Sequence, residues 1–150
     1  SDLNEHETVY GGKLLEMLDG SASISASRLC RTQTATAAVD QFNFIAPFQL
    51  NDSFCIESYV SGVGNRSLEV FAKIVGEHLT TGERFLGATA FLTFVVLKHA
   101  VKLPVITPST PEELMVCQGY SKRHALRKQQ LQKEAFNQGI SILPRWTKNK

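Results

Sequence analysis

The sequence is poor in the residues that mark metal, redox or disulfide proteins. Its 150 residues include three cysteines, and the widely spaced set Cys30, Cys55 and Cys117 contains no C-x-x-C pair. The four histidines form no H-E-x-x-H or H-x-x-x-H motif. These absences argue against a zinc ribbon, a dithiol redox centre and a histidine-based metal site. We therefore expect free thiols, a reducing compartment and no metal.

Long apolar segments are missing as well. The longest uncharged apolar stretch, residues 86–97, has twelve residues, whereas a helix that spans a bilayer needs roughly 20. Residues 1–6 are polar and contain no apolar core of a signal peptide. The sequence thus predicts a protein without a membrane span, located in the cytoplasm.

The composition is that of a folded chain, with 43% hydrophobic and 20% charged residues. The formal net charge of +2 conceals an uneven distribution. Residues 1–120 carry 8 basic and 13 acidic side chains, whereas residues 121–150 carry 8 basic and 1 acidic. An acidic body with a basic tail argues against a basic nucleic-acid-binding domain, and the tail lacks interleaved aromatic residues. We expect no nucleic-acid partner.

Hydrophobic periodicity predicts one helix followed by a series of strands. Within residues 11–31, one helical face collects six apolar side chains, Leu14, Leu15, Leu18, Ala22, Ala26 and Leu29. Period-two patterns then follow in four segments, 34–46, 53–61, 67–78 and 83–97. The last segment is apolar on both faces, which predicts a central or interface strand. Strands joined by short turns predict an antiparallel sheet with one long helix packed on it, an α+β fold.

A second helical region is predicted after a proline-containing loop. Thr110 fits the N-cap, Pro111 the first helical position and Glu113 the third position of a capping box. The helix is expected to end at Gly139, and Gly119 interrupts its weak apolar stripe. We interpret this region as an arm that packs on the body or on a neighbouring subunit.

Two features of the predicted first helix are candidates for chemistry. Asp19 lies at the edge of the apolar arc, where a carboxylate is expected to be partly buried. An ordinary surface aspartate is the alternative. Gly11 and Gly12 stand at the helix start, where free backbone N–H groups can hold an anion or an oxyanion. The alternative is a glycine pair that only makes a turn or a close helix–sheet contact.

The turn between the second and third predicted strands is a third candidate. Asn65, Arg66 and Ser67 supply an amide, a fixed positive charge and a hydroxyl, a combination that suits a phosphate. A solvated hairpin turn is the simpler interpretation. The charge cluster at 121–128 is typical of a solvated helix face.

These candidates lie in register within one longer pattern. Its pieces, in chain order, are D-L-N at 2–4, Y-G-G at 10–12, M-L-D at 17–19, T-A-A-V-D-Q-F-N-F at 36–44, N-R-S-L-E-V at 65–70, T-G-E-R-F at 81–85 and F-L-T-F-V-V-L at 91–97. The set resembles the hot-dog-fold acyl-CoA thioester hydrolases, both the bacterial broad-specificity enzymes and the repeated domains of the animal cytosolic enzymes.

The resemblance implies a long helix wrapped by a curved antiparallel sheet. It assigns residues 1–108 to the hot-dog domain and residues 109–150 to a C-terminal helix and basic tail. Family members usually carry a strand ahead of the first motif, so a first strand is expected before residue 1. The resemblance further implies dimers whose sheets join edge to edge, assembled into tetramers or into hexamers as trimers of dimers.

The resemblance also implies an activity, the hydrolysis of acyl-CoA to a free fatty acid and coenzyme A. Asp19 would be the general base or the direct nucleophile, and Asn4 of the facing subunit would orient water or substrate. The N–H groups of Gly11 and Gly12 would polarise the thioester carbonyl. The phosphates of coenzyme A would lie near three residues of one turn, Asn65, Arg66 and Ser67. Coenzyme A is part of the substrate, and no cofactor is implied.

Two other functions stay open at this point. A non-catalytic acyl-CoA-binding or sensing domain would keep the groove for coenzyme A without the base. A hot-dog hydratase or dehydratase normally needs a histidine on or near the helix, and none lies between residues 7 and 77. In any of these proteins, four basic residues of the arm are candidates to add positive charge near the substrate: Lys122, Arg123, Arg127 and Lys128.

Overall fold

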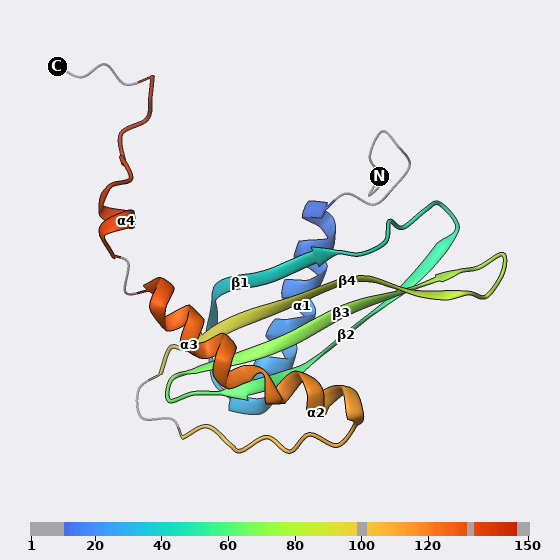
Figure 1. The fold of residues 1–150 in the computed structure, drawn as a ribbon, viewed down its shortest axis with the longest axis horizontal. Coiled ribbons are helices and arrows are strands. Elements are labelled where there is room, and N and C mark those ends of the chain that lie inside the picture. The colour runs from blue at the N-terminus through green and yellow to red at the C-terminus, as the bar shows by residue number, and fades with distance from the viewer. Residues whose placement is uncertain (1–10, 99–101, 132–133, 147–150) are drawn as a thin grey trace.

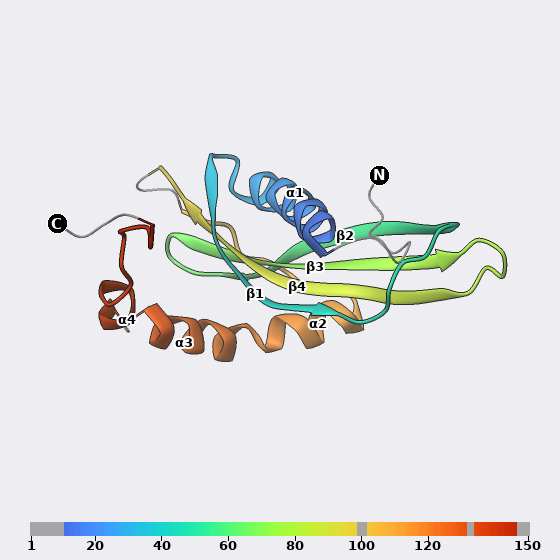
Figure 2. The same cartoon turned by 90° about the horizontal axis from the view of Figure 1, so that it is seen from above.

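A four-stranded antiparallel sheet carries the fold, with helices on both of its faces (Figures 1 and 2). The computed structural model describes residues 11–98, 102–131 and 134–146. The helices are α1 (Gly11–Cys30), α2 (Pro111–Gln118), α3 (Tyr120–Leu131) and α4 (Glu134–Gln138). The strands are β1 (Thr34–Phe44), β2 (Asp52–Val63), β3 (Ser67–His78) and β4 (Arg84–Val96). The helix and the four strands expected before residue 98 are confirmed to within two residues.

The strands are ordered β1-β4-β3-β2. Consecutive hairpins join β2 to β3 and β3 to β4. The first strand of the chain, β1, pairs with the last, β4. The prediction of a central last strand is confirmed. Five consecutive residues of β3, 68–72, are buried. Because successive side chains of a strand point to opposite faces, this run requires that both faces of the sheet be covered.

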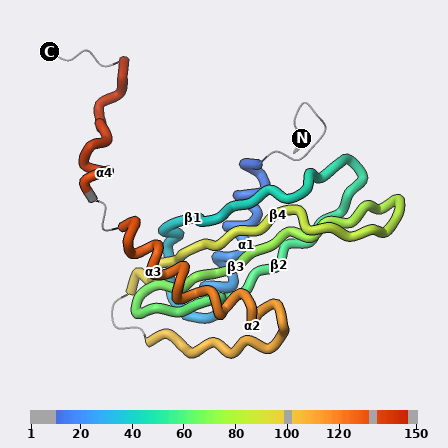
Figure 3. Tube along the Cα trace, viewed as in Figure 1, coloured from blue at the N-terminus to red at the C-terminus, as the bar shows by residue number. Residues whose placement is uncertain are grey.

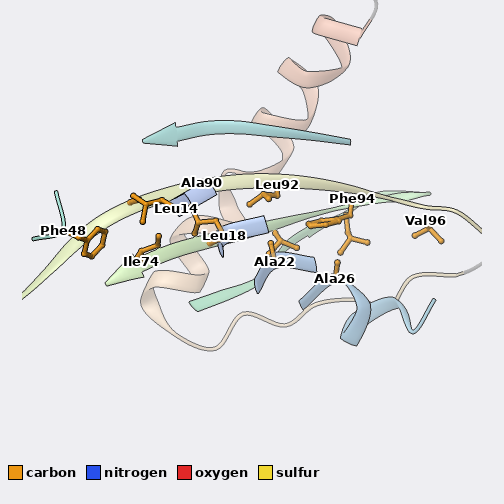
Figure 4. Close-up of a cluster of buried hydrophobic side chains, with 14 residues drawn as sticks. Leu14, Leu18, Ala22, Ala26, Phe48, Ile74, Ala90, Leu92, Phe94 and Val96 are labelled. Carbon is orange, nitrogen blue, oxygen red and sulfur yellow. The ribbon is translucent and has the colours of Figure 1, made fainter. Parts of the chain in front are cut away.

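Helix α1 covers one face through a stripe of small and branched side chains. Figure 4 shows Leu14, Leu18, Ala22 and Ala26 of α1 directed at the central strands. All four are buried, and the two alanines have no exposed surface. The sheet supplies the rest of this core, together with the loop residue Phe48. Its largest buried side chains on the strands are Phe94, Leu68, Ile74 and Leu92. The alanines let the helix backbone lie close to the strands.

Serine hydroxyls attach the flank of α1 to β2. The Ser58 hydroxyl lies 3.0 Å from the Ser21 hydroxyl and 2.7 Å from the Ser25 hydroxyl. It also donates to the Ser21 backbone carbonyl at 3.1 Å. Serine is a poor helix former in isolation. Here two of the helical serines are satisfied across the interface, so tertiary contacts stabilise a segment of low intrinsic helix propensity.

Helices α2 and α3 lie on the opposite face of the sheet (Figure 2). The predicted capping box at Thr110 is present, with Thr110 accepting from the Glu113 backbone N–H. Within α2, Glu112 accepts hydrogen bonds from Tyr59 at 2.9 Å and from Lys73 at 2.7 Å. The Lys73 ammonium lowers the pKa of the Glu112 carboxyl, and Glu112 in turn raises the pKa of Lys73.

A buried ion pair attaches α3 to the sheet. Arg123 donates from Nε and Nη2 to Glu69 of β3, at 3.0 and 2.8 Å, and Ser61 also donates to that carboxylate at 2.6 Å. The guanidinium lies 4.0 Å from the ring centroid of Phe91 and donates to the Val116 carbonyl. Every partner of the two charges is therefore supplied by the protein, as a buried pair requires.

The prediction of one helix from 110 to 139 was wrong, because the arm contains three helices. Gly119 separates α2 from α3, and a Cβ at this position would lie 2.3 Å from Arg123 Nη1. Glycine is needed here because the guanidinium passes over the backbone on its way to the sheet. The predicted end is confirmed, since α4 stops at Gln138 and the Gly139 N–H bonds back to the Ala135 carbonyl.

None of the helices in the described residues is long and apolar enough to cross a membrane. Over the same residues, no three His, Cys, Asp or Glu side chains gather in an arrangement that would bind a metal ion.

Enlarging a small residue of the α1 stripe should destabilise the fold. We expect Ala26→Leu to lower the free energy of unfolding by about 1–3 kcal/mol, because the added atoms must push α1 off the sheet. Urea denaturation measures the change. Ser27→Leu, at the next and exposed position of the same helix, is the matched control and should leave the midpoint nearly unchanged.

Breaking the buried ion pair from one side should be more costly than removing both partners. We expect Glu69→Leu to destabilise the chain by about 3 kcal/mol, because Arg123 is left buried without a carboxylate. The double variant Glu69→Leu with Arg123→Met should recover most of that loss in urea denaturation. Glu77→Gln, which breaks an exposed pair with Arg84, should change stability by less than about 1 kcal/mol. A double variant no more stable than Glu69→Leu alone would contradict this account.

Candidate active site

Asp19 occupies the middle of α1, on the flank that faces β1. It is half-buried, as the sequence predicted. Its Oδ1 accepts a hydrogen bond of 2.9 Å from the Thr36 hydroxyl at the start of β1. Among the described residues, Oδ2 has no donor. The carboxylate is therefore oriented by one neighbour and keeps one oxygen available to water or to a substrate.

The N-terminus of α1 is the second part of the candidate site. The described helix begins at Gly11, and Gly12 is exposed. A Cβ on Gly11 would lie 2.6 Å from Cζ of Phe44, so the aromatic ring at the end of β1 lies directly against the glycine backbone. The first backbone N–H groups of a helix have no partner within the helix and point outward as donors. An anion or a developing oxyanion fits this position.

Apolar side chains surround the start of the helix. Phe44, the last residue of β1, is 62% exposed, and Ile45, which follows it, is 52% exposed. The ring centroids of Phe42 and Phe44 lie 4.6 Å apart. Leu15 adds a partly exposed side chain from α1. Exposed apolar groups gathered beside a polar centre are typical of a ligand-binding surface or of a subunit interface.

Asn4 lies outside the described residues, so its predicted role in the site stays a prediction. The other predicted residues of α1, namely Asp19, Gly11 and Gly12, lie on one helix but not at one point. Eight residues of α-helix separate Gly11 from Asp19, which corresponds to about 12 Å along the axis. One small reacting group cannot contact both from the same chain.

The turn that joins β2 to β3 carries Asn65, Arg66 and Ser67. The side chains of Asn65 and Arg66 are exposed, and the turn is closed by a hydrogen bond from the Gly64 N–H to the Ser67 carbonyl. Ser67 faces a groove on the side of the sheet opposite to α1. In the described part of the chain, the turn makes no contact with Asp19.

Two of the four basic arm residues have partners within the chain. Arg123 is held by Glu69, and Arg127 Nη1 donates to Asp40 of β1 at 3.1 Å. Their charges are therefore compensated by the body. Lys122 and Lys128 are exposed on α3. Two of these four basic residues therefore attach α3 to the sheet.

Thr36 is the residue that sequence reasoning missed. It stands seventeen positions after Asp19 and on another element, so no helical or strand periodicity connects the two. The only available signal was its place as the first residue of the motif T-A-A-V-D-Q-F-N-F at 36–44.

Comparisons with known proteins agree on one family. The model of the thioesterase superfamily matches residues 6–83. The acyl-CoA thioester hydrolase YkhA of Bacillus subtilis is 51% identical over 77% of this chain and 69% of its own length. The human cytosolic acyl coenzyme A thioester hydrolase is 29% identical over 75% of this chain and 31% of its own length.

Solved structures give the same result. The acyl-CoA hydrolase of Bacillus cereus has a TM-score of 0.83 and 38% identity, covering 94% of this chain and 88% of that one. A hexameric acyl-CoA thioesterase has a TM-score of 0.79 and 30% identity, covering 87% and 85%. The acyl-CoA hydrolase of Staphylococcus aureus, solved with butyryl coenzyme A and coenzyme A, has a TM-score of 0.82 and 28% identity, covering 91% and 85%.

Solved structures of three variants of the Staphylococcus aureus enzyme allow a comparison of the sequence spacing between three polar residues. In each variant alanine replaces one residue: an aspartate (26% identity to this chain, TM-score 0.85), an asparagine (27%, 0.79) or a threonine (26%, 0.81). In that enzyme the asparagine lies fifteen residues before the aspartate, and the threonine seventeen residues after it. In this chain Asn4, Asp19 and Thr36 have the same spacing.

Proposed function

The chain belongs to the thioesterase superfamily, and from this premise we propose that it hydrolyses acyl-CoA thioesters to a free fatty acid and coenzyme A. The observation that carries the proposal is the oriented carboxylate of Asp19, held by Thr36 on the flank of α1. The names and bound ligands of the relatives support the substrate class. Coenzyme A is part of the proposed substrate, and we assign no metal and no cofactor.

We assign the attack on the thioester to Asp19. As a general base, the carboxylate takes a proton from water while the water oxygen bonds to the acyl carbon. The tetrahedral oxyanion then collapses, the carbon–sulfur bond breaks, and the thiolate of coenzyme A takes the proton. As a direct nucleophile, Asp19 would instead displace the thiolate and form a mixed anhydride that water opens. A thioester is already activated, so a positioned base and an oxyanion site are sufficient chemistry.

The oxyanion site is assigned to Gly11 and Gly12 of a second subunit. The axial distance of about 12 Å between Gly11 and Asp19 exceeds the size of a reacting carbonyl. One complete site therefore combines Asp19 of one subunit with the helix N-terminus of the facing subunit. Asn4 precedes that N-terminus in the same chain, so it would enter the site together with the glycines and orient the water or the substrate.

A two-subunit site requires self-association. The outer edge of β1 is unpaired within the described sheet, and most of its side chains are exposed. An exposed edge strand presents unpaired backbone groups, a surface that favours pairing with another sheet. We propose a dimer formed edge to edge, assembled further into a tetramer or a hexamer, with the enzyme acting in the cytoplasm. The hexameric relative supports the larger assembly.

We assign the phosphates of coenzyme A to the turn Asn65-Arg66-Ser67. The exposed guanidinium of Arg66 is available to a ligand, whereas Arg123 and Arg127 are held by carboxylates of the sheet. A guanidinium with neighbouring amide and hydroxyl groups binds phosphate oxygens through charge-assisted hydrogen bonds. Residues 1–108 would then contain the groups that contact the substrate, with residues 109–150 as a supporting arm.

Removal of the Asp19 carboxylate should abolish hydrolysis while leaving the fold intact. We expect Asp19→Asn to lower kcat by about 10²–10⁴-fold, because the amide keeps the shape and the contact with Thr36 but cannot accept the proton. Release of free thiol from acyl-CoA substrates of increasing length measures the rate. Glu16→Gln removes an exposed carboxylate of the same helix and should leave kcat unchanged. Equal rates for Asp19→Asn and wild type would remove Asp19 from the mechanism. An absence of hydrolysis by the wild type at every chain length, with acyl-CoA still bound, would instead indicate a binding domain.

Thr36 should act as a positioning residue for Asp19. We expect Thr36→Val to lower kcat by about tenfold or more with little change in KM, since a lost hydrogen bond to a charged group corresponds to about 1.5–3 kcal/mol. Thr36→Ser keeps the hydroxyl and should restore most of the activity. A Thr36→Ser variant as impaired as Thr36→Val would show that the methyl group, and not the hydroxyl, is what matters.

A further inference from the structure

The connection from β1 to β2 crosses the sheet. The two strands occupy opposite edges of the order β1-β4-β3-β2, so residues 45–51 pass over β4 and β3. Figure 3 shows the sheet extending past α1 towards the β3–β4 hairpin, and the connection lies at this part of the sheet. The N–H groups of Ile45 and Ala46 donate to the Gly87 carbonyl of β4, at 2.8 and 3.2 Å, and hold the connection there.

A single side chain of this connection enters the core. Phe48 is 1% exposed, whereas no other residue of 45–51 is buried. Figure 4 shows Phe48 at one end of the core, on the side of Leu14. The centroid of its ring lies 5.3 Å from those of Phe54 and Phe85. This end of the core is therefore closed by a loop residue, and not by a residue of the helix or of a strand.

The Phe48 ring fills a hollow in the sheet. Beneath it lie Gly76 of β3 and Gly87 of β4, which have no side chains to occupy this part of the face. A Cβ on Gly87 would overlap Cζ of Phe48, and a Cβ on Gly76 would lie 2.7 Å from its Cε1. Glycine inside a strand marks a place where another group approaches the backbone closely. Removal of the ring would leave an apolar cavity that continues the core beyond Leu14.

The hollow lies next to the N-terminus of α1, where the proposed oxyanion site is. Phe44 pairs with the residue that follows Gly87, and its ring lies against Gly11. Leu14 follows Gly11 by one turn of the helix and belongs to the same buried core as Phe48. An acyl tail whose carbonyl is bound at the Gly11 N–H is therefore about 5 Å, the rise of one helical turn, from this end of the core.

We propose that Phe48 sets the limit on the length of the acyl chain. The tail enters between α1 and the sheet at Leu14, and the Phe48 ring stops it at the hollow over Gly76 and Gly87. This inference rests on the proposed hydrolysis of acyl-CoA. Because the ring is carried by a connection, a smaller side chain at residue 48 lengthens the pocket while α1 and the strands keep their contacts.

Straight-chain acyl-CoA substrates of increasing length, from butyryl-CoA upward, test the proposal. We expect Phe48→Ala to raise kcat/KM for the longest chains, relative to butyryl-CoA, by about tenfold or more, since one methylene group in an apolar pocket changes kcat/KM by that much. Phe48→Leu removes fewer atoms and should shift the profile in the same direction by a smaller amount. It keeps the measurement available if the alanine variant does not fold.

Two further variants separate the hollow from a general loosening of the core. Phe94→Ala removes the same ring from the other end of the core (Figure 4), where Phe94 is also 1% exposed, and should leave the chain-length profile unchanged. Gly87→Val, added to Phe48→Ala, refills the hollow from the strand and should restore the profile of the wild type.

The possible outcomes distinguish this inference from the proposed function. An active Phe48→Ala variant with the profile of the wild type would overturn the inference alone, and would place the tail on the exposed apolar surface of Phe44 and Ile45 instead. Equal shifts in Phe48→Ala and Phe94→Ala would also overturn it. A wild type that hydrolyses none of the substrates would overturn the proposed function, and the inference with it.

Discussion

The fold depends on covering both faces of two central strands. Strand β3 is buried at five consecutive positions, and β4 alternates buried with partly buried residues, so water must be excluded from both faces of the sheet. Helix α1 meets this requirement on one face by close packing, with Ala22 and Ala26 against the strands. The arm meets it on the other face by a different means, the buried pair of Arg123 and Glu69 with Ser61. The two solutions explain why one side of the sheet is filled while the other keeps a groove.

The same packing fixes the geometry of the proposed site. Helix α1 crosses all four strands (Figure 1). Because it runs without a break over 20 residues, its N-terminus and Asp19 are held two turns apart. A helix that bent to bring its own first N–H groups to Asp19 would lose contact between the alanine stripe and the strands. In the proposed mechanism, each chain supplies two separate parts of the site, and pairing of two chains completes it. Thr36 orients Asp19 from β1, and β1 is also the strand at the free edge of the sheet.

Local patterns in the sequence were sufficient for the first helix, the four strands and the Thr110 capping box, because each is determined by residues within a few positions of one another. They were insufficient where distant residues decide the outcome. Gly119 was visible as an interruption, but the reason for it is a guanidinium that reaches a carboxylate 54 positions earlier in the chain. Arg123 was predicted to add charge near the substrate, whereas it is partly buried, paired with Glu69 and lying over the Phe91 ring. Thr36 was missed because its partner lies on another element.

The charge distribution acquires a structural meaning from these contacts. The acidic body and the basic tail meet at two ion pairs, in which carboxylates of the sheet take up the two arginines of α3. Because the arm uses its arginines in this way, the proposed anionic substrate needs another source of positive charge. Arg66 is the candidate, since it is exposed and forms no ion pair with the described residues. The arm then contributes to function indirectly. It covers part of the second face of the sheet, where its two arginines pair with carboxylates of the strands.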